Sequence, residues 1–200
     1  MLRGVIFDLD GTLVESNLDF HRMRREMGLV PGEYILEAIQ AMDQAEARRC
    51  GLILQRHEIE GARQATLVAG VADLLEELER RGLPLGVVTR NSRQPARAML
   101  ARLLGPIRFD PVLTREDGPI KPDPWAIHHI CRLWNLRPWE VVIIGDFHLD
   151  IDTGRLAGAR TVLYTRGRDA SQMKGAEEAD LVLDSLDDAS PLLAWLDEPA

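Results

Sequence analysis

The chain contains little of what marks a secreted, membrane-spanning or disulfide-stabilised protein. Its 200 residues include two cysteines, Cys50 and Cys131, with no Cys-x-x-Cys pair, so we expect reduced cysteines packed on apolar helical stripes. No stretch approaches the roughly 20 apolar residues that cross a bilayer. The first apolar run, Val5–Phe7, is interrupted by Asp8, so we expect no signal peptide and a cytoplasmic location.

Positive charge is scarce, and lysine most of all. The net charge of −8 argues against a nucleic-acid surface, because phosphate backbones are bound by clusters of Lys and Arg. A phosphorylated substrate would need a local positive field, from a metal ion, helix N-termini and a few basic side chains. Lys121 and Lys174 are the only lysines among 24 basic residues, which draws attention to Lys121.

The order of apolar patterns predicts an α/β fold. Short apolar runs alternate with helical stripes, which is typical of a doubly wound, Rossmann-like parallel sheet flanked by helices. We expect strands at Gly4–Asp8, Leu83–Thr89, Pro111–Thr114, Val141–Asp146, Thr161–Tyr164 and, as a late edge, Leu181–Leu183. Helical stripes lie between them, at Val71–Leu78, Ala96–Leu103 and Ile127–Trp134.

One long segment interrupts this alternation. Residues 15–69 contain no strand-like run, and their helical patterns cover Leu18–Met27, Tyr34–Met42 and Gln44–Leu67. A block of this length exceeds a simple crossover, so we expect a small all-helical insertion. Residues 1–14 and 70–200 would then form the catalytic core. The insertion follows the first strand, where it could act as a lid over the sheet edge.

The first strand ends in two carboxylates, in the run Val5-Ile6-Phe7-Asp8-Leu9-Asp10-Gly11-Thr12. Two anions this close repel each other unless a cation lies between them or one takes a proton. The segment therefore predicts either a site for a hard metal ion or an acid/base pair.

Other polar groups follow the later strands. Thr89 and the amide of Arg90 follow the second, and Lys121 lies in a proline-rich loop before a helix. Asp146 ends the fourth strand, and Asp150 follows it. Because all strands of a parallel sheet present their carboxyl ends at one edge, we expect these groups to converge there.

This ordered set resembles the haloacid dehalogenase-like superfamily of hydrolases. The matching motifs are Val-Ile-Phe-Asp-Leu-Asp-Gly-Thr-Leu at 5–13, Val-Val-Thr at 87–89, Lys-Pro-Asp-Pro at 121–124 and Ile-Gly-Asp-Phe-His-Leu-Asp at 144–150. The helical insertion after the first motif looks like the cap of the phosphoglycolate phosphatase-like subgroup. Two positions depart from the family pattern: Phe147 replaces a usual Ser or Thr, and Arg90 replaces a common Asn.

The resemblance implies phosphoryl transfer with Mg²⁺ as cofactor. Asp8 would be the nucleophile that forms an aspartyl phosphate, and Asp10 would protonate the leaving oxygen and later activate water. Mg²⁺ would bind Asp8, the backbone carbonyl of Asp10 and Asp146. Asp150 would orient the metal or Lys121.

The resemblance also implies a set of phosphate contacts. Thr89 and nearby amides would hold phosphate oxygens, and Lys121 would offset the charge of the phosphate and of Asp8. Gly11 and Thr12 would shape the turn that carries Asp10. Arg90 would either contact a substrate anion or lie on the surface.

In the insertion, a basic cluster of His21, Arg22, Arg24 and Arg25 could recognise a small anionic substrate or could simply face water, with Arg22 and Arg25 our substrate-binding candidates. His57 and Arg63 are weaker candidates. We expect a small-molecule phosphate ester as partner, no nucleic acid, no membrane, and a monomer or homodimer.

The function expected from this resemblance is hydrolysis of a small phosphate monoester, phosphoglycolate first, with sugar phosphates, nucleoside monophosphates or a phosphomutase reaction as alternatives. Halide-releasing relatives lack the second carboxylate of the first motif, and Asp10 is present here. A non-catalytic phosphoacceptor of the receiver type would lack the helical insertion.

Overall fold

The computed structural model describes residues 2–198 and divides into two compact units. The first unit runs up to Glu15 and resumes at Thr66, and the second is Ser16–Ala65. The boundary predicted from the sequence for the end of the insertion is 69/70. Residues 66–69 belong to the first unit because β3 (Thr66–Leu67) pairs antiparallel with β2 (Val14–Glu15). Two-residue strands are too short to show a period in the sequence.

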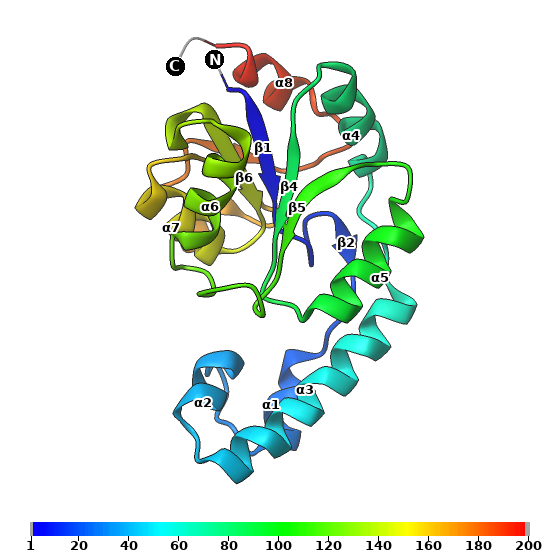
Figure 1. Ribbon diagram of the computed structural model, residues 1–200, viewed down its shortest axis with the longest axis vertical. Helices are drawn as coiled ribbons and strands as arrows, with labels where there is room; N and C mark the ends of the chain where they lie inside the picture. Colours follow the sequence, from blue (N-terminus) through cyan, green and yellow to red (C-terminus); the bar gives the residue numbers. More distant parts are fainter. Residues whose placement is uncertain (1, 199–200) are drawn as a thin grey trace. The chain divides into compact units, whose positions relative to one another are not determined.

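The first unit is built on a six-stranded parallel sheet with the order β5-β4-β1-β6-β7-β8 (Figure 1). Its strands are β1 (Gly4–Phe7), β4 (Leu85–Val88), β5 (Phe109–Leu113), β6 (Val141–Gly145), β7 (Arg160–Tyr164) and β8 (Leu181–Leu183). Every residue of β1, β4 and β6 is buried, as expected for strands covered on both faces. The predicted doubly wound parallel sheet is confirmed.

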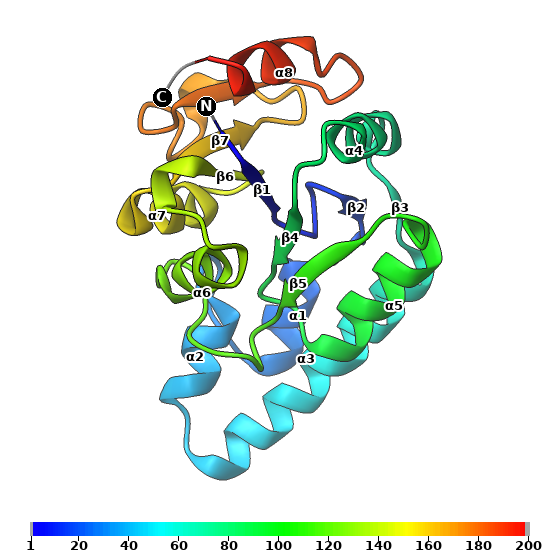
Figure 2. The same ribbon diagram turned by 45° about the horizontal axis from the view of Figure 1, so that its top comes forward.

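Helices cover both faces of this sheet. Figures 1 and 2 show α4 and α5 on one face and α6 and α7 on the other. The bounds are α4 (Val71–Arg80), α5 (Arg93–Leu103), α6 (Trp125–Trp134), α7 (His148–Ala157) and α8 (Ser190–Leu196). Short 3-10 turns occupy Pro138–Glu140 and Ala170–Gln172. The core joins residues of β1, β6 and α6, among them Ile6, Ile143 and Ile130.

The second unit consists of α1 (Phe20–Met27), α2 (Ile35–Ala41) and α3 (Gln44–Gln64). Side chains of Asp19 and Asp43 accept backbone N–H bonds at the N-termini of α1 and α3, which fixes where these helices begin. Apolar side chains from all three helices form its core: Met23, Met27, Ile35, Cys50 and Leu54. Across residues 2–198, the helices are too short or too polar to cross a bilayer.

Candidate functional site

Strand order brings the acidic motifs together. In the order β5-β4-β1-β6-β7-β8 the chain moves outward from β1 in one direction and then in the other, so the topological switch lies between β1 and β6. Asp8 follows β1, and its backbone N–H donates to Ile144 O of β6 at 2.9 Å. One carboxylate oxygen each from Asp8, Asp146 and Asp150 lie within 4.8 Å of one another. The predicted convergence of these three residues is present.

Two glycines make room for this convergence. Gly11 has a φ of +88°, and a Cβ there would lie 2.5 Å from Oδ2 of Asp146. A Cβ on Gly145 would lie 2.2 Å from Cγ of Asp150. Carboxylates can therefore approach the backbone of both turns only because a side chain is missing.

Lys121 lies among these carboxylates. Its Nζ donates to Oδ1 of Asp8 and, at 2.6 Å, to Oδ1 of Asp150. Lys121 is 4% exposed and Asp150 is 2% exposed. Burial alone would lower the pKa of Lys121, but the carboxylates of Asp150 and Asp8 outweigh it and raise that pKa above its usual value. The ammonium group is therefore charged at neutral pH.

The acidic cluster is short of positive charge. Burial raises the pKa of Asp8 to about 6 despite Lys121, and burial with the neighbouring Asp8 raises the pKa of Asp146 to about 6. The pKa of Asp150 is raised as well, chiefly by burial. Asp8 and Asp150 share one buried ammonium, and the cations near Asp146 are two partly exposed arginines, so negative charge is in excess in the buried part of the cluster. Grouped carboxylate oxygens with such an excess fit a hard divalent cation such as Mg²⁺.

Two arginines approach Asp146 from the loop after β7. Arg166 Nη1 lies 3.6 Å and Arg168 Nη2 lies 3.4 Å from Asp146 Oδ2. Arg166 also pairs with Glu15, and Arg168 Nη2 donates to the backbone oxygen of Asp146 at 2.9 Å. The positive charge of both arginines acts to lower the pKa of Asp146 and so opposes the effect of burial. No sequence motif marks this loop, so neither arginine is predicted as a site residue.

The loop after β4 carries Thr89, Arg90 and Asn91. Thr89 is 5% exposed, and its Oγ1 accepts the backbone N–H of Asn91 at 3.1 Å. Arg90, a substrate-binding candidate from sequence, donates through Nη1 to the backbone oxygen of Lys121 at 3.0 Å. This bond ties the loop of Thr89 to the loop of Lys121.

Asp10 and Thr12 lie in the turn after β1. Asn91 Nδ2 donates to Oδ2 of Asp10, a contact that the sequence analysis did not foresee. Thr12 is fully buried, and its Oγ1 has no hydrogen-bond partner among residues 2–198. A buried hydroxyl of this kind is costly unless a ligand satisfies it.

The unusual Phe147 has a structural explanation. The residue is 46% exposed, its ring is tilted by 45° against that of His148 with 4.4 Å between the centroids, and its backbone N–H donates to Asp150 Oδ2 at 3.2 Å. The contribution of position 147 to the site is thus its backbone N–H, which every residue except proline supplies. His148 is buried and its Nδ1 lies 3.1 Å from Asp152.

The basic residues of the second unit are partly engaged within it. Arg22 pairs with Glu26 at 2.9 Å, and Arg24 donates to the backbone oxygen of Glu33 at 2.7 Å. Arg25 is exposed. His57 is buried, with Nε2 3.1 Å from Glu26.

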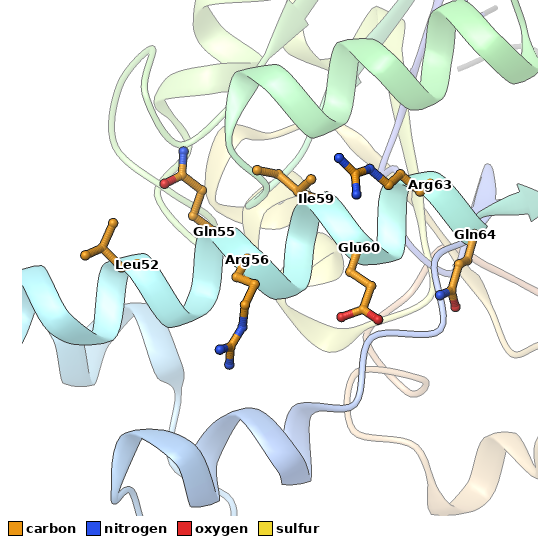
Figure 3. Close-up of a pocket in the computed structure, with 7 residues that line it drawn as sticks. All are labelled: Leu52, Gln55, Arg56, Ile59, Glu60, Arg63 and Gln64. Carbon is orange, nitrogen blue, oxygen red and sulfur yellow. The ribbon is translucent and has the colours of Figure 1, made fainter.

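The last basic candidate of this unit is on α3. Arg63 projects from the same side of the helix as Gln55 and Ile59, along a hollow that these residues help to line (Figure 3).

Comparisons with known proteins show the family and the fold of this chain. The family described as haloacid dehalogenase-like hydrolase matches residues 2–158. A haloacid dehalogenase-like hydrolase domain-containing protein of Arabidopsis thaliana is 31% identical over 96% of this chain and 84% of its own length. A phosphoglycolate phosphatase of Cupriavidus necator is 30% identical over 95% of this chain and 92% of its own. The structure of a hydrolase from Pseudomonas syringae, 21% identical, shares the fold with a TM-score of 0.80 over 98% of this chain and 100% of that one. The chain belongs to the haloacid dehalogenase-like hydrolases.

Proposed function

We propose that this protein is a Mg²⁺-dependent phosphatase that hydrolyses a small phosphate monoester through an aspartyl phosphate on Asp8. The observation that carries the proposal is the cluster of Asp8, Asp146 and Asp150 around Lys121 at the topological switch. Ligands of open α/β sheets bind at that place.

Mg²⁺ would be held by Asp8 and Asp146, with the backbone carbonyl of Asp10 as a further oxygen and Asp150 beside them. The raised pKa of Asp8 and of Asp146, about 6 for each, supports this assignment, because a cation would supply the charge that the cluster lacks. Bound Mg²⁺ would supply neutralisation of the charge on the phosphoryl oxygens.

In the first step, a carboxylate oxygen of Asp8 bonds to phosphorus while the bond from phosphorus to the ester oxygen breaks. Asp10 gives its proton to that leaving oxygen. Asp10, now a carboxylate, then takes a proton from water, whose oxygen attacks phosphorus and releases inorganic phosphate and free Asp8. Lys121, Thr89 and the amides of the β4 loop hold the phosphoryl oxygens. Gly11 and Thr12 form the turn that carries Asp10.

Phosphoglycolate is our first specific substrate proposal, supported by the named relative in Cupriavidus necator. Sugar phosphates are the alternative, and a phosphomutase would use the same core. We further propose that the helical unit Ser16–Ala65 is a cap that selects substrates, with Arg25 and Arg22 as candidate anion contacts. A cytoplasmic location and a monomeric or homodimeric state stay predictions.

The test is turnover of p-nitrophenyl phosphate by the natural protein and by Asp8→Asn, each with Mg²⁺ and with a chelator. We expect turnover only in the natural protein with Mg²⁺. Asp152→Asn is the matched control, because it neutralises a nearby carboxylate outside the cluster and should retain activity. Turnover by Asp8→Asn would remove Asp8 from its role. Phosphoglycolate and sugar phosphates at equal concentration would then rank the substrates.

A further inference from the structure

Asn91 joins the β4 loop to the turn after β1. It is 6% exposed, and its Nδ2 donates to Oδ2 of Asp10, which is 81 residues away in the chain. An amide NH₂ group can donate to one oxygen of a carboxyl group whether or not the other oxygen carries a proton.

The backbone of Asn91 is fixed on both sides. Its N–H donates to Thr89 Oγ1 at 3.1 Å, and its carbonyl oxygen accepts the N–H of Arg115 at 3.2 Å. Arg115 also donates from Nη1 to the backbone oxygen of Arg90 at 3.1 Å. The amide of Asn91 therefore projects from a backbone that is held on both sides.

We infer that Asn91 is a positioning residue for Asp10. By holding Oδ2, it fixes the rotation of the carboxyl group and thus the direction in which Oδ1 points. The inference rests on the proposed function, in which Asp10 passes a proton to the leaving oxygen. Proton transfer requires a short, aligned contact, so a carboxyl group free to rotate transfers less effectively.

If Asn91 positions Asp10, the loss of activity on removing Asn91 should depend on the leaving group of the substrate. A substrate whose leaving oxygen is strongly basic needs the proton of Asp10, whereas p-nitrophenolate departs with little help. Loss of Asn91 should therefore slow phenyl phosphate more than p-nitrophenyl phosphate. The proper quantity is kcat/KM, because it reports the step in which the leaving group departs, while kcat also contains hydrolysis of the aspartyl phosphate.

The experiment compares kcat/KM for both esters in the natural protein, Asn91→Ala and Asn91→Ser. We expect kcat/KM for phenyl phosphate to fall about tenfold more than for p-nitrophenyl phosphate, part of the ~10²- to 10⁴-fold that acid–base catalysis supplies. The control is Thr114→Val, which removes a buried hydroxyl bonded at 2.6 Å to Asp117 in the neighbouring loop. This control should lower the unfolding temperature but leave the ratio of kcat/KM between the two esters unchanged. An equal loss for both esters in the Asn91 variants overturns the inference.

A second readout needs no turnover. Crystal structures of the natural protein and of Asn91→Ser should show the Asp10 carboxyl group in different orientations, and an unchanged orientation also overturns the positioning role. The crystal structures test the positioning role of Asn91 separately from the proposed phosphatase function. They remain informative even if Asp8→Asn retains turnover and the proposed function fails.

Discussion

At the scale of single residues, Lys121 is the most direct test of the proposed site. The one other lysine of the chain, Lys174, supplies a control. Its ammonium group is buried and bonded to Asp8 and Asp150. A substitution that keeps the volume of the side chain but removes its charge would leave both carboxylates buried without that counter-ion.

We expect Lys121→Met to lower kcat/KM at least about 10²-fold, since the charge that faces the phosphoryl group is lost. Removal of one partner of a buried ion pair costs about 3–5 kcal/mol of unfolding free energy at neutral pH. The stability loss should shrink in acid, where Asp8 and Asp150 take protons. Urea unfolding at two pH values and steady-state kinetics check this. Lys174→Met, at an exposed site, is the control, and equal behaviour of the two variants would contradict the assignment.

Some of these residues can be found from sequence and others cannot. Asp8 and Asp146 each follow a buried strand, and the two strands pair in parallel, so their ends meet at one edge. Asn91 contributes through a side-chain bond to a turn 81 residues away, which depends on the register of β1 and β4. Arg22 and Arg24 belong to a basic cluster in the sequence, but Arg22 pairs with Glu26 one turn further along α1 and Arg24 bonds to the backbone oxygen of Glu33 in the loop that follows.

At the scale of elements, the turn from β6 into α7 carries two of the acidic residues. Gly145 ends β6, and Asp150 lies in the first turn of α7. The strand was predicted within one residue, because it is a continuous apolar run. No apolar stripe marks the helix in the sequence, because its buried residues include His148, Asp150 and Thr153.

Gly145→Ala tests whether this turn positions Asp150. The added methyl group would lie 2.2 Å from Asp150 Cγ, so Asp150 must move and its bond to Lys121 must weaken. We expect a loss of about 1–3 kcal/mol in unfolding free energy. We also expect a fall of roughly 10²-fold in kcat, as is typical of a misplacement near 1 Å. Gly51→Ala has open space for its methyl group and should retain full activity. Native kinetics in Gly145→Ala would show that the position of Asp150 does not matter.

At the scale of the whole molecule, an acidic protein concentrates negative charge at its own proposed active site. The net charge is −8, and at the site Asp8 and Asp146 have pKa values raised to about 6 by burial. A carboxyl group whose pKa is higher in the folded than in the unfolded state stabilises the fold most below the unfolded value. That stabilisation is lost as the pH rises through about 6. The metal-free protein should therefore lose this contribution between about pH 4 and pH 6.

Mg²⁺ should reverse that loss, because a cation competes with protons for the same oxygens. We expect Mg²⁺ to raise the unfolding temperature clearly at pH 7.5 and little at pH 5, with protons released when it binds at intermediate pH. Scanning calorimetry with and without a chelator, and titration calorimetry in buffers of different ionisation enthalpy, measure both effects. Asp146→Asn removes one carboxylate and should abolish the Mg²⁺-dependent shift, whereas Asp152→Asn should keep it. A shift of equal size at both pH values would mean that Mg²⁺ binds somewhere other than this buried cluster, since surface carboxylates are already ionised at pH 5.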